Sequence, residues 1–94
     1  MANYIYPAIF TPDNDGGYSV EFPDLDGCYT FGDSLADSLI MAKDALSLYL
    51  YDSECSNRII PVPTKEDYLD VESNQFIRNI HCNTTEYRKC LEAY

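Results

Sequence analysis

Basic residues are scarce in this chain. Its 94 residues include 6 Lys and Arg against 16 Asp and Glu, which gives a formal net charge of -10 at pH 7. Proteins that bind nucleic acid usually present clustered Lys and Arg to the phosphates, so the chain is not expected to bind DNA or RNA by itself. An acidic surface can serve solubility alone, or it can attract and orient a partner of opposite charge.

Histidine and closely spaced cysteines are also lacking. His81 is the single histidine, and no CxxC pair occurs among Cys28, Cys55, Cys82 and Cys90. A zinc site is therefore not expected, and neither is a nucleophilic pair of His81 and Cys82, because adjacent strand residues point to opposite faces. The wide spacing favours free thiols, while the even number of cysteines leaves a disulfide open.

Long apolar segments are absent as well. No segment approaches the ~20 apolar residues of a membrane span, and the start MANYIYPAIF lacks the basic region of a secretion signal. We expect a cytoplasmic protein that does not enter a membrane. Apolar residues make up 46% of the chain, with nine Tyr and four Phe, which is enough for one modest core. The prediction is a single domain over 1–94, with its core at 3–82 and a tail or helix at 83–94.

The first part of the chain predicts an antiparallel meander of three strands. Asn3–Phe10 is rich in aromatic and β-branched residues. Pro7 cannot donate a hydrogen bond, which indicates an edge strand or one that pairs through its other groups at this point. The DNDGG turn leads to a second strand, which begins at Tyr18 and stops at Pro23, and Cys28–Phe31 forms the third.

A long amphipathic helix is predicted next. Asp33 or Ser34 can cap its first turn, and it should extend to about Tyr51. Apolar residues recur along it at steps of three and four, at Leu35, Leu39, Ala42, Leu46 and Leu50. We expect this stripe to lie across one face of the sheet.

The rest of the chain is less regular. Thr64–Val71 is open between a loop and a short helical turn, Asn74–Cys82 is predicted as a further strand, and a short helix should run through Tyr94.

Carboxylates gather around the predicted turns and could in principle bind a hard cation or act as acid and base. The loop that begins at Asp13 nevertheless has Gly17 at its fifth position and Tyr18 at its sixth, where a calcium-binding hand needs an oxygen ligand and a glycine. The phosphate-binding pattern GxxxxGK is absent too. We therefore predict no catalytic residues, no metal and no cofactor.

A series of short motifs follows Pro7 in a specific order and spacing: the DGGY hairpin at Asp15–Tyr18, the FPDLDGC turn at Phe22–Cys28 and the GDSL helix start at Gly32–Leu35. Through these motifs, residues 6–50 resemble the N-terminal domain of the HicB-like antitoxin family. PVP at Pro61–Pro63 and TTEYRK at Thr84–Lys89 extend the resemblance through most of the chain.

This resemblance implies an α+β fold in the order β-β-β-α-β. An antiparallel sheet of three to four strands would carry the long helix on one face, like a partial ribonuclease H fold without nuclease activity, followed by a short C-terminal helix. It also implies a small basic HicA-type mRNA-cleaving toxin as partner, neutralised by masking its RNA-binding surface. The predicted partner-binding residues are Asp13, Asp15, Tyr18, Glu21, Asp24 and Asp26.

Two features qualify this expectation. Members of the family commonly continue past the TTEYRK segment into a ribbon-helix-helix or helix-turn-helix domain, whereas this chain ends at Tyr94, so direct DNA binding is not expected. An edge strand and many tyrosines predict a homodimer or higher homo-oligomer. The alternatives are an orphan homo-oligomeric domain of another role, and a residual metal-dependent nuclease.

Overall fold

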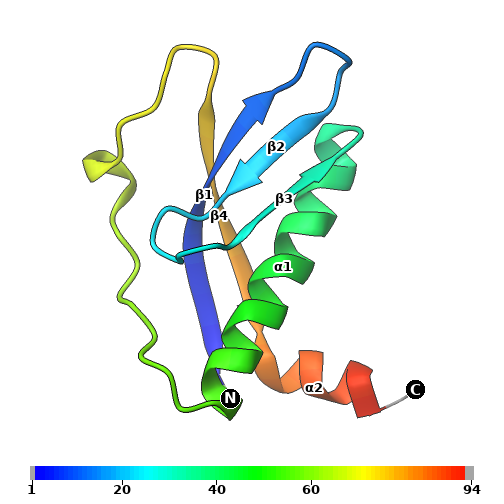
Figure 1. The fold of residues 1–94 in the computed structure, drawn as a ribbon, viewed down its shortest axis with the longest axis vertical. Coiled ribbons are helices and arrows are strands. Elements are labelled where there is room, and N and C mark those ends of the chain that lie inside the picture. The colour runs from blue at the N-terminus through cyan, green and yellow to red at the C-terminus, as the bar shows by residue number, and fades with distance from the viewer. Residues whose placement is uncertain (1, 93–94) are drawn as a thin grey trace.

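A computed structural model describes residues 2–92. A sheet and a long helix form two layers, with a short helix at one end (Figure 1). The elements are β1 (Asn3–Pro12), β2 (Tyr18–Glu21), β3 (Tyr29–Gly32), α1 (Leu35–Cys55), a 3-10 turn (Glu66–Tyr68), β4 (Phe76–Asn83) and α2 (Thr84–Glu92). The predicted α+β class and the order β-β-β-α-β are confirmed.

The strands lie in the order β3-β2-β1-β4, and every neighbouring pair is antiparallel. β1 is therefore an interior strand. Of the two alternatives predicted from Pro7, the edge strand is wrong, and pairing through other groups agrees with the position of Pro7 opposite Asn79 of β4. β4 pairs with β1 from Asn3 to Phe10, whereas β2 pairs with it only from Ile9 to Pro12. At Pro7 the strand thus has one neighbour, so its missing N–H does not interrupt a second ladder. The predicted homodimer rested partly on an edge strand at Asn3–Phe10. That support is lost, and the homodimer stays a prediction.

The core lies between the sheet and α1. Alternate side chains of β1 point toward the helix, and Tyr6, Ala8 and Phe10 are no more than 1% exposed. From α1, Leu46 and Leu50 are fully buried in the same cluster. The apolar stripe on the helix therefore packs where its spacing predicts.

Both ends of α1 have a local cause. The Oγ of Ser34 accepts a hydrogen bond from the amide of Asp37 at 3.1 Å, which confirms the predicted cap. The helix continues past Tyr51 to Cys55 and ends where Asn57 adopts a φ of 56°. A left-handed residue at this position turns the chain out of a helix.

The C-terminal elements are close to their predicted positions. β4 occupies Phe76–Asn83, and a single 3-10 turn interrupts the preceding loop. Asn83 Oδ1 accepts a hydrogen bond from the amide of Glu86 at 2.9 Å and caps α2. The predicted continuation of this helix to Tyr94 lies outside the described residues.

Cys28, Cys55 and Cys82 are free thiols, while the side chain of Cys90 is outside the described part of the structure. Within residues 2–92, no helix is both long enough and apolar enough to cross a membrane.

Glu54, in the last turn of α1, joins three elements. Its Oε2 accepts hydrogen bonds from the Tyr4 hydroxyl of β1 at 2.7 Å and from Thr84 Oγ1 of α2 at 3.1 Å. Burial raises the pKa of Glu54, and the hydrogen bonds from Tyr4 and Thr84 are among several contacts that lower it, so that the net pKa lies below 4.5. Burial and the contact with Glu54 raise the pKa of Tyr4 to about 12.

We expect the Glu54 carboxylate to stabilise the fold at pH values above the ordinary pKa of a glutamate. Because the pKa is lowered in the folded state, the contribution is complete above about pH 4.5 and is lost as the pH falls through the folded-state pKa. Glu54→Gln should therefore lower the Tm at pH 7, and its difference from wild type should shrink at a pH of about 3. Thermal melts followed by circular dichroism would measure this, with Glu66→Gln as an exposed control. An equal difference at both pH values would contradict the assignment.

Candidate functional site

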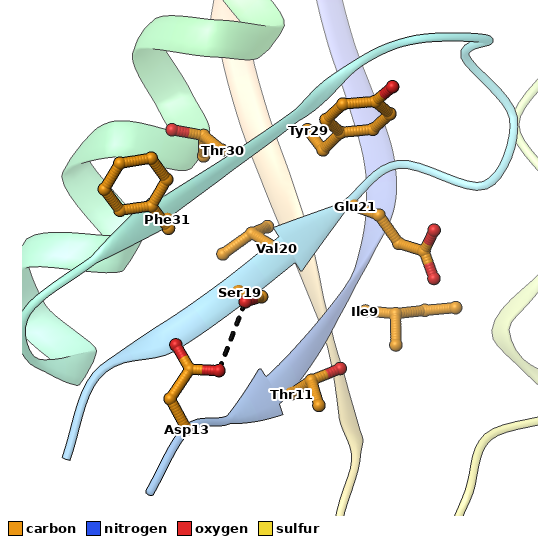
Figure 2. Close-up of a pocket in the computed structure, with 9 residues that line it drawn as sticks. All are labelled: Ile9, Thr11, Asp13, Ser19, Val20, Glu21, Tyr29, Thr30 and Phe31. Carbon is orange, nitrogen blue, oxygen red and sulfur yellow. Dashed lines mark hydrogen bonds between the residues drawn. The ribbon is translucent and has the colours of Figure 1, made fainter. Parts of the chain in front are cut away.

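A hollow of about 690 Å³ lies on the face of the sheet opposite α1, over β1, β2 and β3 (Figure 2). The residues that line it are Ile9, Thr11, Asp13, Ser19, Val20, Glu21, Tyr29, Thr30 and Phe31.

Strand register builds this surface in two rows. Glu21 of β2 lies between Ile9 of β1 and Tyr29 of β3. In the same way, Ser19 lies between Thr11 and Phe31. Side chains opposite each other on neighbouring strands share a face about 5 Å apart, so each row forms a continuous strip across the three strands.

The hollow combines acidic groups with exposed aromatic rings. Asp13 follows the second row, and its Oδ1 accepts a hydrogen bond from Ser19 Oγ at 3.3 Å. Tyr29 is 70% exposed and Phe31 is 72% exposed, and both rings stand on the outer strand in Figure 2. None of the described lining residues is Lys or Arg. Such a surface suits cationic groups, because carboxylates attract a guanidinium or ammonium and ring faces stack against it.

Asp13 and Glu21, two of the predicted partner-binding residues, are thus brought together at the hollow. Asp15 is exposed in the neighbouring hairpin, where its Oδ1 accepts a hydrogen bond from the amide of Gly17 at 3.1 Å. Asp26 is exposed in the turn between β2 and β3. Asp15 thus stabilises its turn through a hydrogen bond, whereas Asp26 is an exposed residue of its turn. The role of both carboxylates in binding a partner stays a prediction.

Tyr18 and Asp24 lie elsewhere. Tyr18 packs against the core, with its ring centroid 5.8 Å from that of Phe76 in an edge-to-face arrangement. Asp24 is half-buried, and its two oxygens accept hydrogen bonds from the amide of Thr64, at 2.9 Å, and from the Thr64 hydroxyl. The Tyr6 hydroxyl donates to the Pro61 carbonyl in the same segment. The hydrogen bonds of Asp24 with Thr64 therefore hold the segment that follows α1 against the turn between β2 and β3.

The sequence prediction did not include Ile9, Tyr29 and Phe31. The alternation of Tyr29 and Phe31 in a short aromatic strand was a signal that both share a face. Which face they share depends on the pairing of β3 with β2, and the amino-acid sequence alone does not show that register.

Across residues 2–92, no group of three or more His, Cys, Asp and Glu side chains is arranged to hold a metal ion. The groups whose pKa values are raised, Tyr4, Tyr6, Cys28 and Cys82, do not line this hollow. Burial raises the pKa of the Cys28 thiol to about 11, and it also raises the pKa of Cys82.

Comparison with known proteins gives consistent results. The family model described as HicB-like antitoxin of bacterial toxin-antitoxin systems matches residues 6–81. Antitoxin HicB 1 of Photorhabdus laumondii is 39% identical over 73 residues, which cover 76% of this chain and 47% of the relative. Antitoxin HicB of Escherichia coli K12 is 38% identical over 63 residues, which cover 63% of this chain and 43% of the relative. The chain thus spans about half the length of these relatives.

Two solved structures share the fold. One is a toxin-antitoxin complex from Streptococcus pneumoniae, with a TM-score of 0.77 and 24% identity over 90% of this chain and 72% of that chain. The other is a HicA3 and HicB3 toxin-antitoxin complex, with a TM-score of 0.64 and 25% identity over 84% of this chain and 95% of that chain. The family match extends from β1 through most of β4, so the chain belongs to the HicB-like antitoxin family of bacterial toxin-antitoxin systems.

Proposed function

We propose that this chain neutralises a small basic HicA-type toxin by covering the toxin's RNA-binding surface, with no catalysis of its own. The observation that carries the proposal is the acidic and aromatic hollow on the open face of β1, β2 and β3, in a chain with a net charge of -10. A protein surface that binds RNA is basic, because it must neutralise phosphates. Carboxylates on a rigid sheet compete for the same cationic groups.

The residues divide by role. Glu21 and Asp13 contact Lys or Arg of the toxin, while Tyr29 and Phe31 supply ring faces and apolar area. Asp15 and Asp26 add negative charge at the rim and mainly increase the rate of association. Asp24 and Tyr18 support the site indirectly, the first through Thr64 and the second through the core.

Co-expression tests the proposal. The HicA-type protein encoded beside the gene for this chain should inhibit growth when expressed alone, and this chain should restore growth and purify together with it. Failure of both rescue and co-purification would contradict the proposal. A gene neighbourhood without a small basic reading frame would instead favour the orphan homo-oligomeric domain.

Reversing one charge in the hollow is expected to weaken the complex. Glu21→Lys places a cation in the cross-strand row between Ile9 and Tyr29, where it faces the toxin's own basic groups. Like charges across an interface cost several kcal/mol, so the Kd should rise by about tenfold or more. Isothermal titration against the toxin would measure this. Glu66→Lys, which makes the same charge change on the exposed 3-10 turn, is the matched control, and an equal loss for both variants would show that only net charge matters.

A further inference from the structure

A second hollow, of about 420 Å³, lies between α1 and the beginning of β3. Ala45, Leu48 and Tyr49 of α1 line one side, and Cys28 lines the other. Tyr29 lines both this hollow and the acidic one on the open face of the sheet. The two hollows therefore meet at Tyr29, one on each side of β3.

The second hollow differs from the first in charge. Its acidic residue, Asp52, forms an ion pair with Arg58, whose guanidinium carbon also lies 5.9 Å from the centre of the Tyr49 ring. Its remaining walls are mainly apolar, and the Leu48 side chain is 56% exposed. An apolar side chain fits this hollow, whereas a cationic one fits the first.

We infer that the toxin contacts β3 on both faces. A Lys or Arg of the toxin lies beside Glu21 and Asp13, and an apolar side chain of the toxin packs against Leu48. Tyr29 becomes buried between these two contacts. The inference rests on the proposed function, because the occupant is the same basic toxin. It adds a second contact and the chemistry of the toxin residue that makes it.

Interface size supports a contact that spans both hollows. A stable protein–protein interface uses about 20 to 30 residues on each side, which is more than line the acidic hollow. Most of the binding energy usually comes from a few apolar or aromatic anchors that fill pockets near the centre of the interface. Tyr29 occupies that central position, and Leu48 offers the adjoining apolar pocket.

Matched substitutions test the second contact. Leu48→Gln and Tyr29→Ala should each raise the Kd for the toxin by about tenfold or more in isothermal titration. Ile40→Gln is the control for Leu48, since Ile40 is 62% exposed on the same helix and lines neither hollow. Tyr68→Ala is the control for Tyr29, since Tyr68 is 77% exposed on the 3-10 turn. Both controls should bind within about twofold of wild type.

Side-chain footprinting of the wild-type chain keeps the test independent of folding effects. Hydroxyl radicals should oxidise Tyr29 and Leu48 in the free chain and spare them in the complex, while Ile40 and Tyr68 stay reactive. If the wild type binds the toxin and Leu48 remains reactive, or Leu48→Gln binds as wild type, the second contact is refuted and the proposed function stands. If the wild type does not bind the toxin, the proposed function itself fails.

Discussion

Leu46→Asp is expected to abolish the folded state. Leu46 is fully buried on α1 in the same cluster as Tyr6 and Phe10. Losing the leucine removes about 2 to 3 kcal/mol of hydrophobic stabilisation, and an unpaired buried carboxylate costs several kcal/mol more. The sum is comparable to the total stability of a small domain, about 5 to 15 kcal/mol. Circular dichroism should show no cooperative thermal transition.

A second aspartate on the same helix provides the control for this result. Ile40→Asp introduces the same carboxylate at a position that is 62% exposed, and it should melt close to wild type. A cooperative transition near the wild-type Tm for Leu46→Asp would mean that α1 does not pack on the sheet through this residue.

Gly32→Ala is expected to have the next largest effect. A Cβ at Gly32, the last residue of β3, would lie 2.5 Å from the amide nitrogen and 2.6 Å from the Cα of Ser38 in α1. These are backbone atoms, so relief requires β3 and the helix to move apart. Overpacking of this kind costs about 3 kcal/mol, which should lower the Tm by more than about 10 °C.

Gly16→Ala separates steric crowding from backbone strain. Gly16 has a φ of 92° in the hairpin between β1 and β2, and a Cβ there meets no atom within 4 Å. The substitution should therefore cost only the strain of a left-handed alanine, about 1 kcal/mol. Equal losses for Gly16→Ala and Gly32→Ala would contradict close contact between β3 and α1. The contact matters for the site, because β3 carries both Tyr29 and Phe31.

Much of the local structure could be predicted. Ser34 caps α1 as expected, because a cap depends only on residues within one helical turn. The buried face of α1 follows from its spacing of leucines, and the turn between β1 and β2 follows from its glycines. The family resemblance is likewise carried by short motifs that are visible along the chain.

Pairing between distant segments could not be predicted in this way. Pro7 suggested an edge strand, but β4, near the other end of the chain, pairs with β1 and makes it central. Asp24 looked free to bind a partner, yet it accepts two hydrogen bonds from Thr64, which comes after α1.

The sequence by itself determined the acidity of this protein, the kind and approximate bounds of its strands and helices, and its resemblance to the HicB-like antitoxins. These properties depend on composition or on residues close together in the chain. Only the tertiary structure decided which side chains share the open face. Glu21 meets Ile9 and Tyr29 there because strand register depends on hydrogen bonds between separate segments, and a shift of one residue would turn every side chain to the opposite face.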